Sequence, residues 1–227
     1  MESERILSLD MSTKTGWASA ISSDSGIKLE DYGVLEQIHQ PEGNYPSNYV
    51  RWAYMVYEEV RKLIERIKPD TIVIEETSKG SKNALSQKVL EWLHFLVAQW
   101  ITNHEMKTVY LMTGEWRREI GCQMSEEEKL KNKEVRAYKK AYEKKHGKKT
   151  TVAYDINGKR IGLTGKKHVN VRRANEIFGD QLKEPLRRKS EDEADALGLL
   201  ASYHLRRTKK SDKVEEVTLE DIVKGKV

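Results

Sequence analysis

The stretch RILSLDM at residues 5–11 decides the fold, because it is a short apolar run with an acid, Asp10, near its end. Runs of this length bounded by turn residues are typical of β-strands buried in a sheet. Turn-forming residues follow at 12–15, and GWASAI at 16–21 then predicts the antiparallel partner of the first strand. A third strand is predicted over 27–38, so the chain begins with three antiparallel strands.

Helices and strands alternate through the next part of the chain. Apolar residues recur at three- and four-residue steps over 49–67, which predicts an amphipathic helix that ends before Pro69. The β-branched run at 71–76 predicts a strand that is buried on both faces. A long helix over 84–103 and a strand over 107–112 come next. This order predicts an α/β fold with a mixed five-stranded sheet flanked by helices.

The later part of the chain is more basic and less periodic. The lysine-rich segment 124–150 predicts an exposed helix or a mobile arm. Residues 151–164 predict a small hairpin with Asn157-Gly158 as its turn. Two further helices are predicted, over 166–178 and 191–206.

The chain has 227 residues, which suffices for one well-packed domain. We therefore predict one domain over residues 1–208, with a basic insertion at about 123–164, and a charged tail over 209–227. We find neither a signal-peptide layout at the N-terminus nor a stretch of roughly 20 apolar residues that would span a bilayer. The single cysteine, Cys122, has no partner for an internal disulfide. We expect an intracellular, cytoplasmic protein with no membrane partner.

The net charge is +5, and lysine and arginine dominate from Arg117 to Lys189. This distribution indicates a polyanionic partner, although an ordinary solvated surface would produce the same pattern.

Four acids lie where the predicted fold can bring them together. Asp10 closes the first strand, Glu75 follows the apolar run of a later strand, and Asp192 and Asp195 lie one helical turn apart. Clustered carboxylates repel one another unless a cation lies between them. Hard divalent cations such as Mg²⁺ accept such oxygen ligands, and two of them can promote phosphodiester hydrolysis. Each acid alone has an ordinary structural explanation, so the joint arrangement carries the prediction.

The last helix is predicted to have two sides. We expect its acids on one side and an apolar stripe packed on the sheet on the other, made of Ala194, Leu197, Leu200 and Ala201.

The sequence resembles the RuvC-type Holliday junction resolvases of the ribonuclease H-like superfamily. LSLDMSTKTGWA resembles their first motif, IVIEE their second and EDEADALGLL their last, and the resemblance covers most of 4–122 and 165–204. It implies a ribonuclease H-like fold and a homodimeric endonuclease that resolves Holliday junctions and other branched DNA. It also implies two Mg²⁺ ions, replaceable by Mn²⁺, held by four catalytic ligands: Asp10, Glu75, Asp192 and Asp195. Glu76 and Glu191 are adjacent acids that the pattern does not exclude.

The same resemblance assigns roles to basic residues. Arg117 falls where a DNA-binding residue is expected after the fifth strand. Lys167 matches a lysine near the start of the following helix and is expected to stabilise charge at the scissile phosphate, with Lys166 as its rival. The loop after Glu75 lacks the aromatic that some members insert at the junction, but Lys79 and Lys82 are expected to hold phosphates. Ordinary contact with the phosphate backbone or with solvent would explain Arg117 and Lys167 equally well.

Some alternatives stay open at this point. The insertion at 123–164 either extends the DNA footprint or is a solvated segment without a special role, and it suggests a divergent form, such as a viral or phage one. The apolar stripe of the 84–103 helix, with Trp92, Leu96 and Trp100, serves as a dimer face or as core. Other functions to weigh are a ribonuclease H-like nuclease acting on RNA or linear DNA, a non-catalytic branched-DNA binder, and an ATPase relative. The ATPase lacks support, because we see no second glycine-rich phosphate loop.

Overall fold

A computed structural model describes residues 2–77 and 84–215, without the side chains of 166–167 and 210–215. At its centre lies a five-stranded sheet in the order β3-β2-β1-β4-β5. β2 is antiparallel to both β1 and β3, whereas β4 and β5 run parallel to β1. The strands are β1 (Glu4–Asp10), β2 (Gly16–Ser23), β3 (Gly26–Val34), β4 (Thr71–Glu75) and β5 (Lys107–Leu111). The predicted mixed sheet is therefore confirmed.

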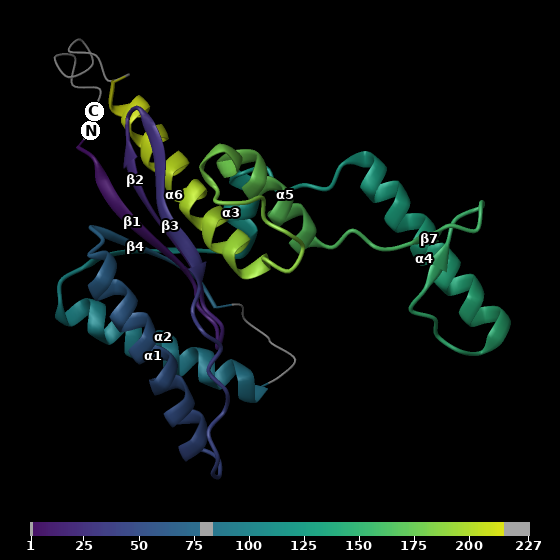
Figure 1. The fold of residues 1–227 in the computed structure, drawn as a ribbon, viewed down its shortest axis with the longest axis horizontal. Coiled ribbons are helices and arrows are strands. Elements are labelled where there is room, and N and C mark those ends of the chain that lie inside the picture. The colour runs from purple at the N-terminus through teal and green to yellow at the C-terminus, as the bar shows by residue number, and fades with distance from the viewer. Residues whose placement is uncertain (1, 78–83, 216–227) are drawn as a thin grey trace, which may run out of the picture.

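Helices cover both faces of this sheet (Figure 1). On one face lie α1 (Ser47–Ile67) and α2 (Ala84–Asn103), which pack on each other and on the sheet through one cluster of buried apolar residues. On the other face lies α6 (Glu191–Glu215), with α3 (Thr113–Glu119) and α5 (Lys166–Phe178) packed against it. The sheet thus separates two apolar cores.

The alternation of side chains along β1 decides which core each residue enters. Leu7 and Leu9 belong to the core under α1 and α2, whereas Ile6 belongs to the core under α6. Asp10 has the same parity as Ile6, so its carboxylate faces α6.

The same rule separates the two glutamates at the end of β4. Val73 belongs to the α6 core, while Ile72 and Ile74 belong to the core of α1 and α2. Glu75 therefore faces α6, and Glu76, which follows the strand and is exposed, does not. Alternation thus favours Glu75 over Glu76 as the partner of the acids on α6.

A close approach between α6 and the first hairpin fixes the start of this helix. A Cβ atom added to Gly16 would lie 2.1 Å from the backbone oxygen of Asp192, so only glycine fits here. Further along, the buried hydroxyl of Ser8 donates a hydrogen bond of 2.8 Å to the carbonyl of Ala196. These contacts hold the first turns of α6 against the ends of β1 and β2.

A glycine within α6 itself, Gly198, allows α3 to pack closely on this helix. A Cβ atom on Gly198 would lie 2.3 Å from the ring of Trp116, a fully buried residue of α3. The sheet, α3 and α5 all pack against α6. The four residues of the predicted apolar stripe are buried as expected, and Asp195 on the acidic side is buried as well, at 7% exposed.

Three expectations about the bounds or existence of elements differ from the structure. β3 ends at Val34, not at residue 38. The helix α3 was not predicted, because seven residues show too little periodicity to be recognised. The last helix continues to Glu215, past the predicted end at residue 206.

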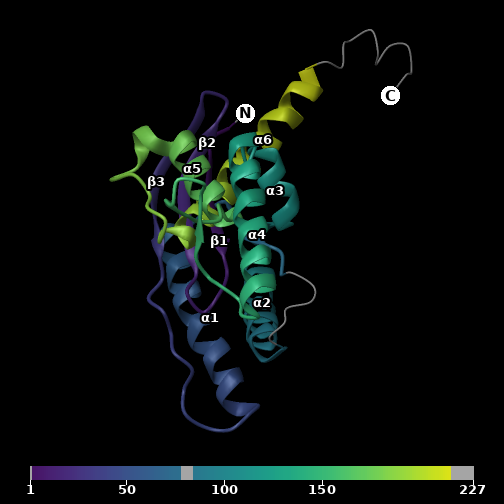
Figure 2. The same ribbon diagram turned by 90° about the vertical axis from the view of Figure 1, so that its right-hand side faces the viewer.

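The basic insertion forms an arm that projects from the body of the protein (Figure 1) and comes toward the reader in Figure 2. It consists of α4 (Glu126–His146) and a small hairpin of β6 (Ala153–Tyr154) and β7 (Arg160–Ile161). Arg172 of α5 pairs with Glu128 at 2.6 Å, which ties the first turn of α4 to the body. The predicted exposed helix and hairpin are confirmed.

None of the helices in the described residues combines the length and the apolar character needed to cross a bilayer.

The contact at Gly16 gives a first prediction. Gly16→Ala should destabilise the protein by about 1–3 kcal/mol, because the new methyl group must displace the backbone of Asp192. Thermal or denaturant unfolding measures this loss. Gly179→Ala is the matched control, since a Cβ there meets nothing within 4 Å. Equal stability of both variants would contradict the proposed contact.

Candidate active site

Two acids meet at adjacent strand ends. Leu9 of β1 pairs with Ile74 of β4 in parallel register, so the next residues, Asp10 and Glu75, lie side by side. Their carboxyl groups are within hydrogen-bonding distance of each other. Trp116 donates a hydrogen bond from its indole nitrogen to Oε1 of Glu75 at 3.2 Å. The orientation of Glu75 is therefore set by α3 as well as by β4.

The other two acids come from the first turns of α6. Both oxygens of Asp195 accept hydrogen bonds: Oδ1 from the amide of Asn170 and Oδ2 from Nη2 of Arg117 at 3.1 Å. Asp192 is more exposed, and its Oδ2 lies 3.0 Å from the ammonium of Lys14. The turn between β1 and β2 thus supplies one cation and α3 supplies another.

The four acids share one electrostatic environment. Burial raises the pKa of Asp10 well above its ordinary value of 3.8, and the negative charges of Glu75, Asp195 and Asp192 raise it further. The three acids that act on Asp10 are the three that the sequence grouped with it. The structure therefore brings the four predicted residues together.

These carboxylates have the donor chemistry of a Mg²⁺ site, and the raised pKa of Asp10 marks a place where positive charge is favoured. Within residues 2–77 and 84–215, however, no three His, Cys, Asp or Glu side chains are arranged as a group that could hold a metal ion. In the structure Arg117 and Lys14 pair with Asp195 and Asp192 instead. The chemistry of the four carboxylates fits a divalent cation.

Sequence reasoning missed four neighbours of the acids. Trp116, Asn170 and Lys14 bond to them directly, and no periodic pattern marks such contacts. His94 of α2 lies near enough to Glu75 for that charge to act on it, but burial dominates and lowers the pKa of His94 to about 4. His94 is therefore a neutral imidazole at neutral pH.

Among the predicted basic residues, the structure describes the side chain of Arg117 but not those of the four lysines. Arg117 lies in the cluster, with its guanidinium over the ring of Trp116 at 5.0 Å. Lys166 and Lys167 are the first residues of α5, and their side chains lie outside the described part. Lys79 and Lys82 also lie outside the described residues. Their roles stay predictions.

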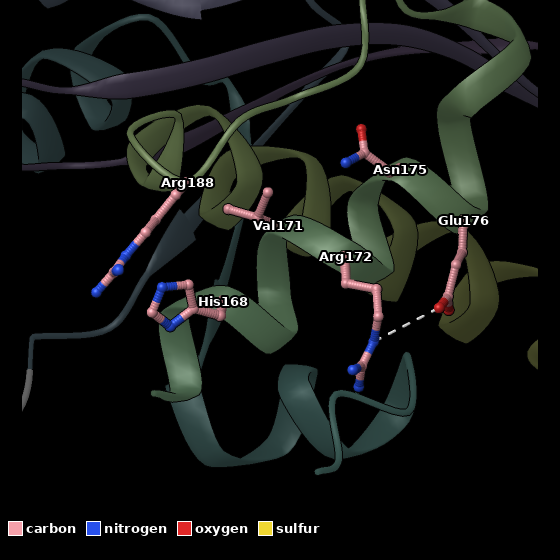
Figure 3. Close-up of a pocket in the computed structure, with 6 residues that line it drawn as sticks. All are labelled: His168, Val171, Arg172, Asn175, Glu176 and Arg188. Carbon is pink, nitrogen blue, oxygen red and sulfur yellow. Dashed lines mark ion pairs between the residues drawn. The ribbon is translucent and has the colours of Figure 1, made fainter. Parts of the chain in front are cut away.

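A hollow of about 440 Å³ lies on another part of α5 (Figure 3). Figure 3 shows Arg172 turned toward Glu176 of the same helix, and their charged atoms are 3.7 Å apart. None of the four clustered acids lines this hollow, whose walls are His168, Val171, Arg172, Asn175, Glu176 and Arg188. It is therefore separate from the candidate active site.

No protein-family model and no curated protein sequence matches the chain. Solved structures do match. Thermus thermophilus RuvC in complex with a Holliday junction substrate has a TM-score of 0.55 at 12% identity, covering 90% of this chain and 97% of that one. The chain has the ribonuclease H-like fold of RuvC. A second structure of Thermus thermophilus RuvC gives a TM-score of 0.55 at 15% identity over 90% and 96% of the two chains. The yeast mitochondrial Holliday junction resolvase gives 0.45 at 10% identity over 93% and 84%.

The ribonuclease H-like fold predicted from three motifs is thus confirmed, and the low identities make this a divergent version of it. In this chain the four acids lie at the ends of β1 and β4 and at the start of α6.

The raised pKa of Asp10 gives a second prediction. The folded state holds the proton of Asp10 more tightly than the unfolded state, so ionisation costs stability as pH rises from about 4 through the folded-state pKa. Asp10→Asn should therefore be more stable than the wild type at pH 8 in EDTA, and this advantage should shrink toward pH 4. Thermal unfolding across this pH range measures the difference. The exposed acid variant Asp180→Asn should show no such trend, and an Asp10→Asn advantage that is constant with pH would contradict the prediction.

Proposed function

We propose that this protein is a metal-dependent endonuclease that cuts four-way DNA junctions and other branched DNA. The observation that carries the proposal is the convergence of Asp10, Glu75, Asp192 and Asp195 at one end of the sheet in a RuvC-like fold. The similarity to RuvC supports the fold, and the acids support the chemistry.

The four acids are the proposed ligands of Mg²⁺, or of Mn²⁺ as a substitute. When bound, two such cations would activate a water molecule and stabilise the leaving oxygen of the phosphodiester. The chain's own residues prepare this site. Trp116 orients Glu75, and Asn170 orients Asp195.

Cationic side chains supply the rest of the proposed machinery. Arg117 and Lys14 balance the charge of the acids in the structure, and they are the proposed contacts to DNA phosphates beside the site. Lys167 is the proposed contact to the scissile phosphate, because it is the second residue of α5, the helix that also carries Asn170. Lys166 is the alternative, and Lys79 and Lys82 are proposed phosphate contacts.

A homodimer is part of the proposal, because a two-fold protein matches the two symmetric incisions of a four-way junction. α2 offers the face for it. The core of this helix is formed by Val89, Leu93, Val97 and Ile101, while Phe95 is 64% exposed. Trp92 and Trp100 are partly buried against that core.

The first test is cleavage of an immobile four-way junction in Mg²⁺, where the wild type should make paired nicks at symmetric positions. Asp10→Asn and Asp195→Asn should each lower the cleavage rate at least about 10²-fold, because each removes a charge that holds the cations. Junction binding, measured by gel shift, should be retained.

Asp180→Asn, at an exposed acid away from the cluster, is the matched control and should cleave like the wild type. Full activity of Asp10→Asn and Asp195→Asn would rule out this site. Binding without cleavage by the wild type would favour a non-catalytic binder of branched DNA.

The second test compares substrates. At equal concentration the protein should cleave the four-way junction faster than a linear duplex of the same sequence and faster than an RNA–DNA hybrid. Initial rates in Mg²⁺ measure the preference. A hybrid or a linear duplex cut at least as fast as the junction would instead favour a general ribonuclease H-like nuclease.

A further inference from the structure

A cavity of about 620 Å³ lies beside α3 and α5, next to Asp195. Two of its lining residues, Arg117 and Asn170, are the residues that bond to Asp195. The cavity and the candidate active site therefore share a wall.

The lining of the cavity is cationic. Arg117, Arg118 and Lys129 contribute to it, and none of its described lining residues is an acid. Lys129 pairs with Glu126, but both are exposed and the pair is open to water, where such contacts are weak. A ligand with negative charge is favoured here.

Part of the wall is suited to an uncharged ring. Met124 contributes a polarisable side chain, and Cys122 lies beside it. Burial raises the pKa of the Cys122 thiol to about 11, so it is neutral at physiological pH. The cavity thus combines an anion-binding side with a neutral one.

The shared wall also holds two polar atoms that lack hydrogen-bond partners within the described residues. These are Oδ1 of Asn170, a residue that is 1% exposed, and Nε of Arg117. Buried polar groups are nearly always bonded, so these two atoms leave hydrogen-bonding capacity unused beside the cavity.

We infer that this cavity binds one nucleotide of the cleaved DNA strand, directly beside the scissile phosphate. The phosphate of that nucleotide lies against Arg118 and Lys129, and its base lies along Met124 toward Asn170. The inference rests on the proposed function and adds a site for the substrate. The volume falls within the range of about 300–1,000 Å³ typical of pockets for small ligands, so it is large enough for a single nucleotide.

This site would also account for selectivity toward branched DNA. A base enters a pocket only after it leaves its stack, which costs a few kcal/mol in an intact duplex and less where pairing is already disturbed. Bases at a branch point meet this condition, whereas those in a linear duplex do not.

The test uses Asp10→Asn, which binds without cutting, and four-way junctions that carry 2-aminopurine at single positions around the cleavage point. This base fluoresces weakly in a stack and strongly outside it. We expect a several-fold rise in fluorescence on protein binding at one position next to the cleaved bond, and little change at the others.

The second variant fills the cavity. Gly114 lines it, and a Cβ atom there meets nothing within 4 Å, so Gly114→Phe places a ring at an open position of the cavity wall. In the Asp10→Asn background this variant should abolish the rise in 2-aminopurine fluorescence and weaken junction binding about tenfold. A tenfold loss of affinity corresponds to about 1.4 kcal/mol of lost base contacts. Gly179→Phe, at an open position outside the cavity, should change neither quantity. Circular dichroism of both variants checks that they fold.

The outcomes separate the two proposals. Junction binding with no position-specific rise, or with a rise that Gly114→Phe leaves intact, would overturn the nucleotide site alone. Absence of any junction binding by Asp10→Asn and by the wild type would overturn the proposed function, and the nucleotide site with it.

Discussion

The close contact of α6 with the first hairpin is the constraint on which the site depends. Gly16 leaves no room for a side chain against the backbone of Asp192, and Ser8 holds the next turn through the carbonyl of Ala196. Because of this contact, the acids of α6 lie beside Asp10 and not out in solvent. A shift of α6 by the width of one methyl group would change the distance between the charges.

This arrangement is electrostatically expensive, and the chain offsets it with its own cations. Asp10 is surrounded by like charges, which raise its pKa, while Lys14 and Arg117 pair with the acids of α6. Sites that store such repulsion are common where a protein binds cations or performs chemistry. The same repulsion that weakens the fold would attract the divalent ion of the proposed function.

Local patterns predicted the parts of the fold that have their own periodicity. The strand ending at Asp10, the choice of Glu75 as a candidate and the long helices all followed from runs of apolar residues. The helix α3 was missed, because it is too short to show a period. The burial of Asp195 was also missed, because periodicity on one helix does not reveal that two others enclose it.

By itself, the sequence named the four acids as candidates, since each stands at the end of a strand or near the start of a helix, but it left their neighbours Glu76 and Glu191 open. Only the tertiary structure decided what surrounds them: the indole of Trp116 on Glu75, Asn170 on Asp195 and Lys14 on Asp192. The reason is physical. Strand and helix signals repeat over a few residues, whereas these bonds join distant segments and leave no local trace in the sequence.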